Sequence, residues 1–327
     1  MICQVPFTTL YVHGNLTFTT CCPTWLERGC IHSYVKGESA MSVWNSTELR
    51  KARSEWLSCT PQETCSKCPL YATRDKNVMV DGMWQSDVVD RGPTRIYLSD
   101  ERACNLHCWT CRSSHQGPSA VREKQAALTR KVIDDFIQEA EWLSMLHSGE
   151  VFASTYHVDI LRGIDASKCP KLGIELFTNG ILLPRRWPEL ENIHPIVQQI
   201  TMSIDAASKD VYEKVRAPAK WEQIQETLRF VSKLRDGGLP WFQCNFVARR
   251  TNMHDIIPFV DMCLDHGATM VRYSIFDKTW MSEEAYRSEI CYDDPEFHSI
   301  VNNDRLNRPE VNIDILRAAA SGAQIMA

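Results

Sequence analysis

Residues 104–111 read CNLHCWTC, which spaces three cysteines as C-x3-C-x2-C, and a short strand-like stretch, TRIYLSD at 94–100, precedes them. Three thiolates on one short loop can hold three corners of an iron–sulfur cube, because cysteine is the usual ligand of such clusters. No fourth cysteine follows nearby, so one iron would remain open to a substrate or cofactor. A zinc site completed by His107 or His115 is the alternative.

The composition narrows the classes of protein that such a loop can belong to. The chain has 327 residues, 14 of them Cys, and a net charge of −5, which argues against a nucleic-acid binder that works by bulk charge. Its opening, MICQVPFTTL, lacks the basic and apolar regions of a secretory signal, and no stretch approaches the ~20 apolar residues of a membrane span. We therefore expect a cytoplasmic protein whose cysteines bind metal or take part in catalysis.

Downstream of the cysteines, strand-like and helix-like stretches alternate. Helical spacing of apolar residues predicts helices over 121–141, 209–216, 221–235 and 255–266. Further strand-like segments occupy 142–150, 172–180, 196–206, 241–250 and 268–276. This alternation predicts a parallel sheet with crossover helices, in which chemistry gathers at the carboxyl ends of the strands. The polar residues at or just beyond those ends are Ser148, Gly149, Glu150, Ser203, Asp205 and Arg216.

The cysteine spacing, the preceding strand and the phrase CNLHCWTCR resemble the radical S-adenosyl-L-methionine (SAM) enzymes. The resemblance implies a partial (β/α)6 barrel, expected over residues 92–280. It also implies a 4Fe-4S cluster on Cys104, Cys108 and Cys111, whose open iron SAM chelates. Reductive cleavage of SAM then yields a 5′-deoxyadenosyl radical. The family usually has an aromatic residue directly before the third cysteine, where this chain has Thr110.

The same resemblance assigns roles to the polar residues of the barrel. Ser148, Gly149 and Glu150 stand where the family has a Gly-Gly-Glu motif that receives the SAM amino group. Ser203 and Asp205 stand where its fourth strand contacts the ribose. Arg216 matches an arginine that often meets the SAM carboxylate.

The first 72 residues form a second cysteine-rich unit. Residues 8–20 predict a β-hairpin that turns at Gly14-Asn15. The pattern CxxPF, G, CC, W, WNS, R and C-x2-C resembles the SPASM/twitch domains, which bind an auxiliary 4Fe-4S cluster. That resemblance implies the ligand set Cys3, Cys21, Cys65 and Cys68. Cys22 is the substitute for Cys21, since six residues separate Gly14 from Cys21 where the family usually has four. The unit also precedes the barrel rather than following it, and zinc is the alternative metal.

The remaining segments have weaker assignments. Residues 73–91 are expected to be a linker and 281–327 a C-terminal extension. On the fifth strand, alternation places Gln243, Asn245 and Val247 toward the barrel interior, which turns Cys244 toward the helices. If the reaction is an epimerisation, candidate thiol hydrogen donors are Cys244, Cys263 and Cys291.

Taken with the resemblances, these features predict an α/β enzyme of the radical SAM type. It would abstract hydrogen from a C–H bond, and the auxiliary cluster would assist a net oxidation. The expected substrate is a peptide, as for RiPP-type maturases, or a natural-product small molecule. An alternative is a sugar, aminocyclitol or nucleoside dehydrogenase or epimerase. A non-catalytic zinc or iron–sulfur protein is the alternative of another class. The expected electron donor is a flavodoxin or ferredoxin, with neither nucleic acid nor membrane as partner.

Overall fold

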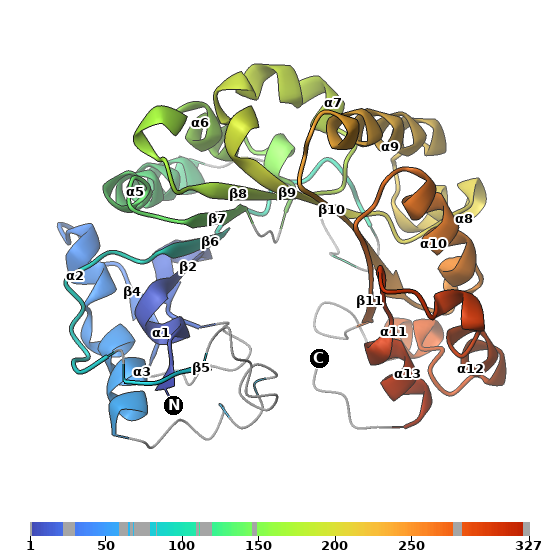
Figure 1. Ribbon diagram of the computed structural model, residues 1–327, viewed down its shortest axis with the longest axis horizontal. Helices are drawn as coiled ribbons and strands as arrows, with labels where there is room; N and C mark the ends of the chain where they lie inside the picture. Colours follow the sequence, from blue (N-terminus) through green and yellow to red (C-terminus); the bar gives the residue numbers. More distant parts are fainter. Residues whose placement is uncertain are drawn as a thin grey trace.

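The computed structural model describes residues 2–21, 30–58, 65, 68, 79–82, 84–108, 111, 120–145, 149–276 and 283–322. One curved sheet organises these residues, with the strand order β12-β11-β10-β9-β8-β7-β6-β2-β3-β4. The sheet bends into an arch whose convex side is covered by helices (Figure 1). This is an open barrel wall with an outer helical layer.

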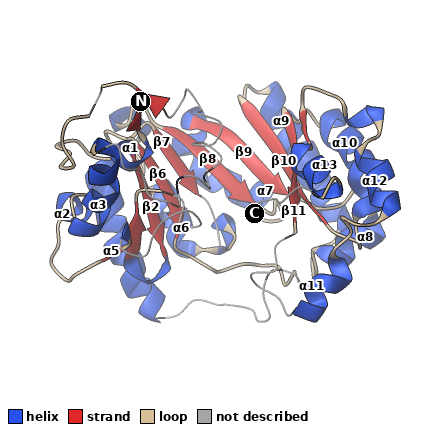
Figure 2. Cartoon of the chain, turned by 90° about the horizontal axis from the view of Figure 1, so that it is seen from below, coloured by secondary structure: helices blue, strands red, loops and turns tan. Residues whose placement is uncertain are grey.

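Six strands of the sheet are the six predicted from the alternating pattern, and the expected barrel class is confirmed. They are β6 (Arg95–Ser99), β7 (Trp142–Met145), β8 (Gly173–Thr178), β9 (Val197–Ser203), β10 (Trp241–Ala248) and β11 (Met270–Ile275). Each is parallel to its neighbour. Because all six run the same way, their carboxyl ends meet at one rim of the arch, and the strands lie side by side in Figure 2.

Helices connect these strands across the convex face, as a parallel sheet requires. The longer ones are α5 (Ala120–Phe136), α6 (Thr155–Arg162), α8 (Lys209–Val215), α9 (Trp221–Asp236) and α10 (Ile256–Asp265). Shorter segments in the connections are η4 (Val151–Ala153), η5 (Ala166–Lys168), α7 (Leu183–Arg186), η6 (Trp187–Ile196) and η7 (Met253–Asp255). The four helices predicted in this region are present as α5, α8, α9 and α10.

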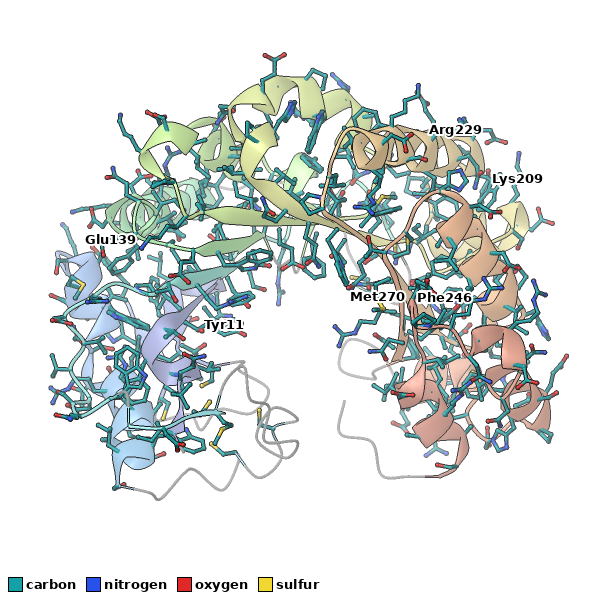
Figure 3. The ribbon with its side chains drawn as sticks, in the orientation of Figure 1. Tyr11, Glu139, Lys209, Arg229, Phe246 and Met270 are labelled. Atoms are coloured by element: carbon teal, nitrogen blue, oxygen red, sulfur yellow. The ribbon has the colours of Figure 1, made fainter. Side chains whose placement is uncertain are left out.

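Side chains alternate between the helical layer and the concave side of the sheet. On β8, Ile174 and Leu176 are fully buried in the main core, whereas Phe177 is only partly buried. On β10, Phe246 packs edge-on against Phe259 of α10, with ring centroids 5.0 Å apart. In Figure 3 the labelled Glu139, Arg229 and Lys209 lie on the outer side of the arch, and Tyr11 lies on its inner side. The concave side is therefore where a substrate can meet the sheet.

The N-terminal segment extends this sheet rather than forming a hairpin apart from it. Strands β2 (Thr9–His13) and β3 (Thr17–Thr19) are antiparallel, as predicted, and turn through η1 (Gly14–Leu16), where Asn15 has φ 61°. However, β2 is also parallel to β6 along five register pairs. The physical reason is that the free edge of β6 offers unpaired backbone groups, which a neighbouring strand satisfies.

The other N-terminal elements surround this hairpin. They are β1 (Ile2–Cys3), α1 (Val5–Thr8), β4 (His32–Ser33), α2 (Ala40–Trp44), α3 (Thr47–Leu57) and β5 (Met79–Val80). Helices α2 and α3 are separate, because Asn45 ends α2 and Ser46 precedes α3. Strands β1 and β5 form a separate two-stranded antiparallel pair.

The C-terminal residues close the other edge of the arch. They form α11 (Glu283–Glu289), α12 (Pro295–Val301), η9 (Asp304–Leu306), β12 (Val311–Asn312) and α13 (Asp314–Ala320). Strand β12 pairs in parallel with β11 and so adds a strand to the predicted six. Among the described helices, none combines the length and apolar character that crossing a membrane requires.

Candidate functional site

The cysteine loop leaves the carboxyl end of β6 and is tied to two distant segments through its backbone. The amide of His107 donates to the carbonyl of Ala217 at 2.7 Å, and the carbonyl of Ala103 accepts from the amide of Glu150 at 2.7 Å. The backbone of His107 is anchored by this hydrogen bond, and its side chain is exposed on the loop. Trp109 and Thr110 lie outside the described residues.

The sulfur of Cys104 already lies among hydrogen-bond donors. The amide of Leu106 donates to Cys104 Sγ at 3.4 Å, and Asn179 Nδ2 lies 3.8 Å from the same atom. Donors directed at sulfur stabilise a thiolate and tune an iron–sulfur cluster. Cys104 and Cys108 are partly buried and Cys111 is exposed. Within the described ranges, no three His, Cys, Asp or Glu side chains are gathered closely enough to hold a metal ion, so the ligand set stays a prediction.

Gly149 and Glu150 lie directly against this loop. A Cβ at Gly149 would fall 2.4 Å from the carbonyl oxygen of Ala103 and 3.0 Å from that of Glu101. Both atoms belong to backbone, which cannot swing aside as a flexible side chain does, so this position accepts only glycine. The predicted Ser148 lies outside the described residues. Gly149 and Glu150 of the predicted Ser-Gly-Glu segment therefore pack against the cysteine loop.

Glu150 is buried among three hydrogen-bond donors. Its carboxylate accepts from Thr178 Oγ1 at 2.6 Å, from the amide of Asn179 at 2.6 Å and from the amide of Phe152 at 3.3 Å. Burial raises the pKa of Glu150 to about 7, although these hydrogen bonds and the nearby charge of Arg216 oppose the rise. The carboxylate is therefore poised to change its charge near neutral pH.

Asp205 and Arg216, predicted to contact different parts of SAM, are paired with each other. Arg216 Nη2 lies 2.9 Å from Asp205 Oδ2, and Arg249 Nη2 lies 2.7 Å from the same oxygen. Asp205 has φ 63° and also accepts from the amide of Val247 at 2.9 Å. Its carboxylate thus binds protein donors, and Ser203, the other predicted ribose residue, is partly exposed on β9.

Sequence reasoning missed Arg249. Its only signal was the basic pair that ends the stretch WFQCNFVARR. Arg249 is buried and bound to Asp205 at the carboxyl ends of neighbouring strands β9 and β10. Two guanidinium groups therefore share the carboxylate of Asp205 at this rim.

Arg216 lies between the Asp205–Arg249 ion pair and Cys108 of the cysteine loop. Burial opposes its charge, but Asp205 and the thiol of Cys108 outweigh that effect and raise the pKa of Arg216. Its Nε is buried and has no hydrogen-bond partner among the described residues. A buried donor without a partner is costly unless a ligand satisfies it. These features fit a small anionic group bound between Cys108 and Arg216.

The four predicted auxiliary ligands lie within electrostatic range of one another. Burial raises the pKa of the Cys3 thiol to about 11, and the nearby Cys68 and Cys65 thiols raise it further. Burial also raises the pKa of Cys21, with Cys3, Cys65 and Cys68 contributing. The amide of Cys68 donates to the carbonyl of Cys65 at 3.0 Å. The hairpin and the C-x2-C turn are thus brought together, while Cys22 lies outside the described residues.

The candidate hydrogen donors lie elsewhere. Cys244, Cys263 and Cys291 are fully buried. Cys244 on β10 and Cys263 on α10 contact each other between sheet and helix, as the thiol-to-thiol contribution to the raised pKa of Cys263 indicates. The prediction that Cys244 faces the helices is confirmed. The placement of these two thiols gives no support to their proposed role as hydrogen donors to a substrate in the barrel.

The concave wall near the loop carries aromatic and hydrogen-bonding side chains that sequence patterns did not reveal. Tyr11 of β2 stacks on Tyr97 of β6, with centroids 4.6 Å apart. Buried Glu175 accepts from Ser144 Oγ at 2.8 Å and from Gln199 Nε2 at 2.6 Å. Because β2 supplies Tyr11, the N-terminal segment contributes to the same wall as the barrel strands.

The rim of the open barrel brings together a three-cysteine loop, a buried glutamate and a buried arginine whose Nε has no partner among the described residues. Such an arrangement is typical of a cofactor-dependent enzyme. Comparison with known families is consistent with this class, since the profile of the Radical SAM superfamily matches residues 100–262. Through this region the chain belongs to the radical SAM superfamily. That family implies a 4Fe-4S cluster and SAM.

Curated relatives are distant. A protein named "Probable GTP 3',8-cyclase" from Methanocaldococcus jannaschii is 23% identical over 178 residues, covering 54% of this chain and 56% of the relative. A protein of the same name from Saccharolobus islandicus strain Y.N.15.51 is 24% identical over 182 residues, covering 54% of each. The match thus spans about half the length of these relatives.

Two solved structures are also similar. Streptococcus suis SuiB bound to precursor peptide SuiA has a TM-score of 0.46 at 11% identity, covering 90% of this chain and 68% of that one. Native anSMEcpe with bound AdoMet has a TM-score of 0.49 at 15% identity, covering 67% of this chain and 64% of that one.

Proposed function

We propose that this protein reductively cleaves SAM at a cluster held by Cys104, Cys108 and Cys111, and oxidises a C–H bond of a substrate in the concave side of the barrel. The bound cluster and SAM supply the radical chemistry, and the protein positions them and excludes water. In this proposal Glu150 receives the SAM amino group and Arg216 binds its carboxylate.

The observation that carries the proposal is the meeting of three distant segments at one rim. The loop after β6, the Gly149–Glu150 segment after β7 and Arg216 after α8 are joined by the contacts of Ala103, Cys108 and Ala217. A ligand that bears both an amino and a carboxylate group fits between a buried acid and a buried guanidinium donor. Glu150 and Arg216 offer this pair beside the thiols.

An auxiliary cluster on Cys3, Cys21, Cys65 and Cys68 would assist the reaction by taking an electron from the substrate. Loss of a hydrogen atom followed by loss of an electron and a proton is a net two-electron oxidation, as in dehydrogenation or cross-link formation. The proximity of the four thiols supports this assignment. Epimerisation is the weaker candidate, because Cys244 and Cys263 pack between β10 and α10.

The substrate is proposed to be a peptide or a polar natural-product small molecule. The hydrogen-bonding groups of the wall, such as Ser144, Glu175 and Gln199, suit a polar molecule. A nucleotide is the second candidate, favoured by the name of the relatives that match half of this chain. A flavodoxin or ferredoxin would be the electron donor.

Anaerobic reconstitution with iron and sulfide tests the proposal. We expect about eight irons per chain, as two 4Fe-4S clusters require, and dithionite-dependent release of 5′-deoxyadenosine from SAM. Replacing Cys104, Cys108 and Cys111 together by Ala should remove about half of the iron and abolish SAM cleavage. Cys169→Ala is the matched control, since Cys169 is a lone buried cysteine remote in sequence from both sets.

The substrate class is then decided by adding candidates to the active protein. GTP and any short peptide encoded beside the gene are the first two arms, and each is scored by increased 5′-deoxyadenosine release and by a product of altered mass. Zinc in place of iron, with no SAM cleavage by the unaltered protein, would overturn the proposal.

A further inference from the structure

The cysteine loop begins at Asp100, which forms a buried pair with a helix on the outer layer of the barrel. His157 Nε2 of α6 lies 2.9 Å from Asp100 Oδ1, and the two side chains are 1% and 8% exposed. A carboxylate only accepts hydrogen bonds, so His157 Nε2 carries the proton and donates. Neither residue belongs to the three-cysteine motif or to the residues expected to contact SAM.

The pair joins the two backbone segments that the proposed SAM site needs to keep together. Asp100 precedes Cys104 by four residues. On the other side, α6 begins shortly after Glu150, and Ser154 caps it by accepting from the amide of His157 at 3.2 Å. The loop and the Glu150 segment also meet directly, through the hydrogen bond between Glu150 and Ala103.

Together these contacts close a ring. It runs from Asp100 along the loop to Ala103, across to Glu150, onward to Ser154 and His157, and back to Asp100. In such a ring, the hydrogen bond between the side chains fixes the base of the loop relative to the helix. Without it, the described contacts left between the two segments are the Ala103–Glu150 hydrogen bond and the packing of Gly149 on the loop backbone.

Titratable side chains lie around the pair of Asp100 and His157. Burial raises the pKa of the neighbouring Tyr156, and the charge and the side chain of Asp100 raise it further, so Tyr156 stays a neutral phenol beside Asp100. Burial lowers the pKa of His13 on β2, although Asp100 opposes this effect. Arg130 is the nearby cation, and it bonds Asp134 at 2.8 Å and the carbonyl of Asp159 at 2.8 Å. In the part of the chain that the structure describes, His157 Nε2 is the hydrogen-bond partner of Asp100 Oδ1, and Tyr156 lies beside the pair.

We propose that Asp100 and His157 are positioning residues that set the placement of the cysteine loop against the Gly149–Glu150 segment, and so the affinity for SAM. This inference rests on the proposed SAM-cleaving function. It assigns the pair no contact with SAM or with the cluster irons. Partners that orient a metal site from outside its ligands typically change affinity or activity by about 10- to 100-fold when they are lost.

The test compares three variants of the reconstituted protein. His157→Phe keeps a ring of similar volume but removes the donor, whereas His157→Gln keeps an N–H donor and should rescue. His32→Phe is the matched control, because His32 is also buried and bonds the carboxylates of Glu38 and Glu48 at 3.0 Å, outside the loop. The measurements are iron content, melting temperature, KM for SAM, kcat for 5′-deoxyadenosine release, and the change that SAM causes in the electron paramagnetic resonance spectrum of the reduced cluster.

For His157→Phe we expect iron content near that of the unaltered protein, KM for SAM raised about 10-fold or more, and a weaker spectral response to SAM. His157→Gln should bring KM for SAM back to within about 3-fold of the unaltered protein, which is most of the expected 10-fold change. Loss of iron uptake in His157→Phe at an unchanged melting temperature would also support the proposal, because it places the defect in the loop.

Two results would overturn it. One is an unaltered KM and spectral response in His157→Phe. The other is an equal loss of melting temperature and activity in His157→Phe and His32→Phe, which would make the pair an ordinary packing contact. Absence of SAM cleavage by the unaltered protein is a distinct failure, since it removes the proposed function itself and this inference with it.

Discussion

Glu150 should make the stability of the folded protein depend on pH, and Glu150→Gln should remove that dependence. Burial raises the pKa of Glu150 from 4.5 to about 7 in the folded state. Between these two values the unfolded chain has lost the proton that the folded chain still holds. The free energy of unfolding contributed by this group therefore falls as the pH rises from about 4.5 to about 7, and is constant above that range.

The magnitude follows from the size of the shift. The two pKa values differ by about 2.5, which at about 1.4 kcal/mol per unit gives about 3.5 kcal/mol of stability lost across the whole window. The amide side chain introduced by Glu150→Gln would not titrate. Its NH2 group would, however, face one of the donors that bond the carboxylate in the unaltered protein. That cost is the same at every pH, so the difference between the two proteins isolates the titration.

The assay is denaturant unfolding of identically reconstituted proteins at pH 5, 6, 7 and 8. Relative to unaltered protein, Glu150→Gln should gain about 2.5 kcal/mol of stability between pH 5 and pH 8, because the part of the window below pH 5 is not sampled. Glu139→Gln is the matched control, because it makes the same substitution at a residue on the outer side of the arch (Figure 3). A difference between Glu150→Gln and unaltered protein that does not vary with pH would refute the reasoning. It would mean that Thr178, Asn179 and Arg216 together hold the carboxylate charged.

Three further changes have definite expected outcomes. Gly149→Ala should lower SAM cleavage and reduce the free energy of unfolding by about 1–3 kcal/mol, since its Cβ would meet backbone atoms. Gly163→Ala should cost less, because its Cβ would meet the movable end of the Arg130 side chain. Thermal melting and 5′-deoxyadenosine release compare the two variants. Asp205→Asn should destabilise the protein by about 3–5 kcal/mol in denaturant unfolding, because two buried guanidinium groups lose their carboxylate, and a cost below about 1 kcal/mol would contradict this. Cys68→Ser should reduce iron content while SAM cleavage persists, and equal loss of both would count against a separate auxiliary cluster.

Local patterns predicted the strands and helices of the barrel well, because each buries one face against the next. Alternation alone placed Cys244 toward the helices, and β10 confirms it through the contact of Phe246 with Phe259. The cysteine loop and Glu150 were found because their spacing and strand-end positions are visible in the chain. These are properties of short stretches, and they need no knowledge of distant partners.

What the sequence did not reveal depends on contacts between distant segments. The parallel pairing of β2 with β6 joins residues more than 80 positions apart, and no local period encodes it. The ion pairs of Asp205 with Arg216 and Arg249 likewise join residues that no local pattern connects, whereas the predicted contact of Asp205 with SAM stays a prediction. A local sequence pattern does not indicate which polar side chains from distant segments will contact one another in the folded protein.

The pairing of β2 with β6 also limits how this protein can be divided. A fragment beginning near residue 92 would contain the whole family match, yet it would leave β6 with a bare edge along the five positions that β2 covers. An exposed edge strand recruits strands from other molecules and promotes aggregation. Recombinant work on the barrel should therefore retain the N-terminal hairpin, even where only SAM cleavage is of interest.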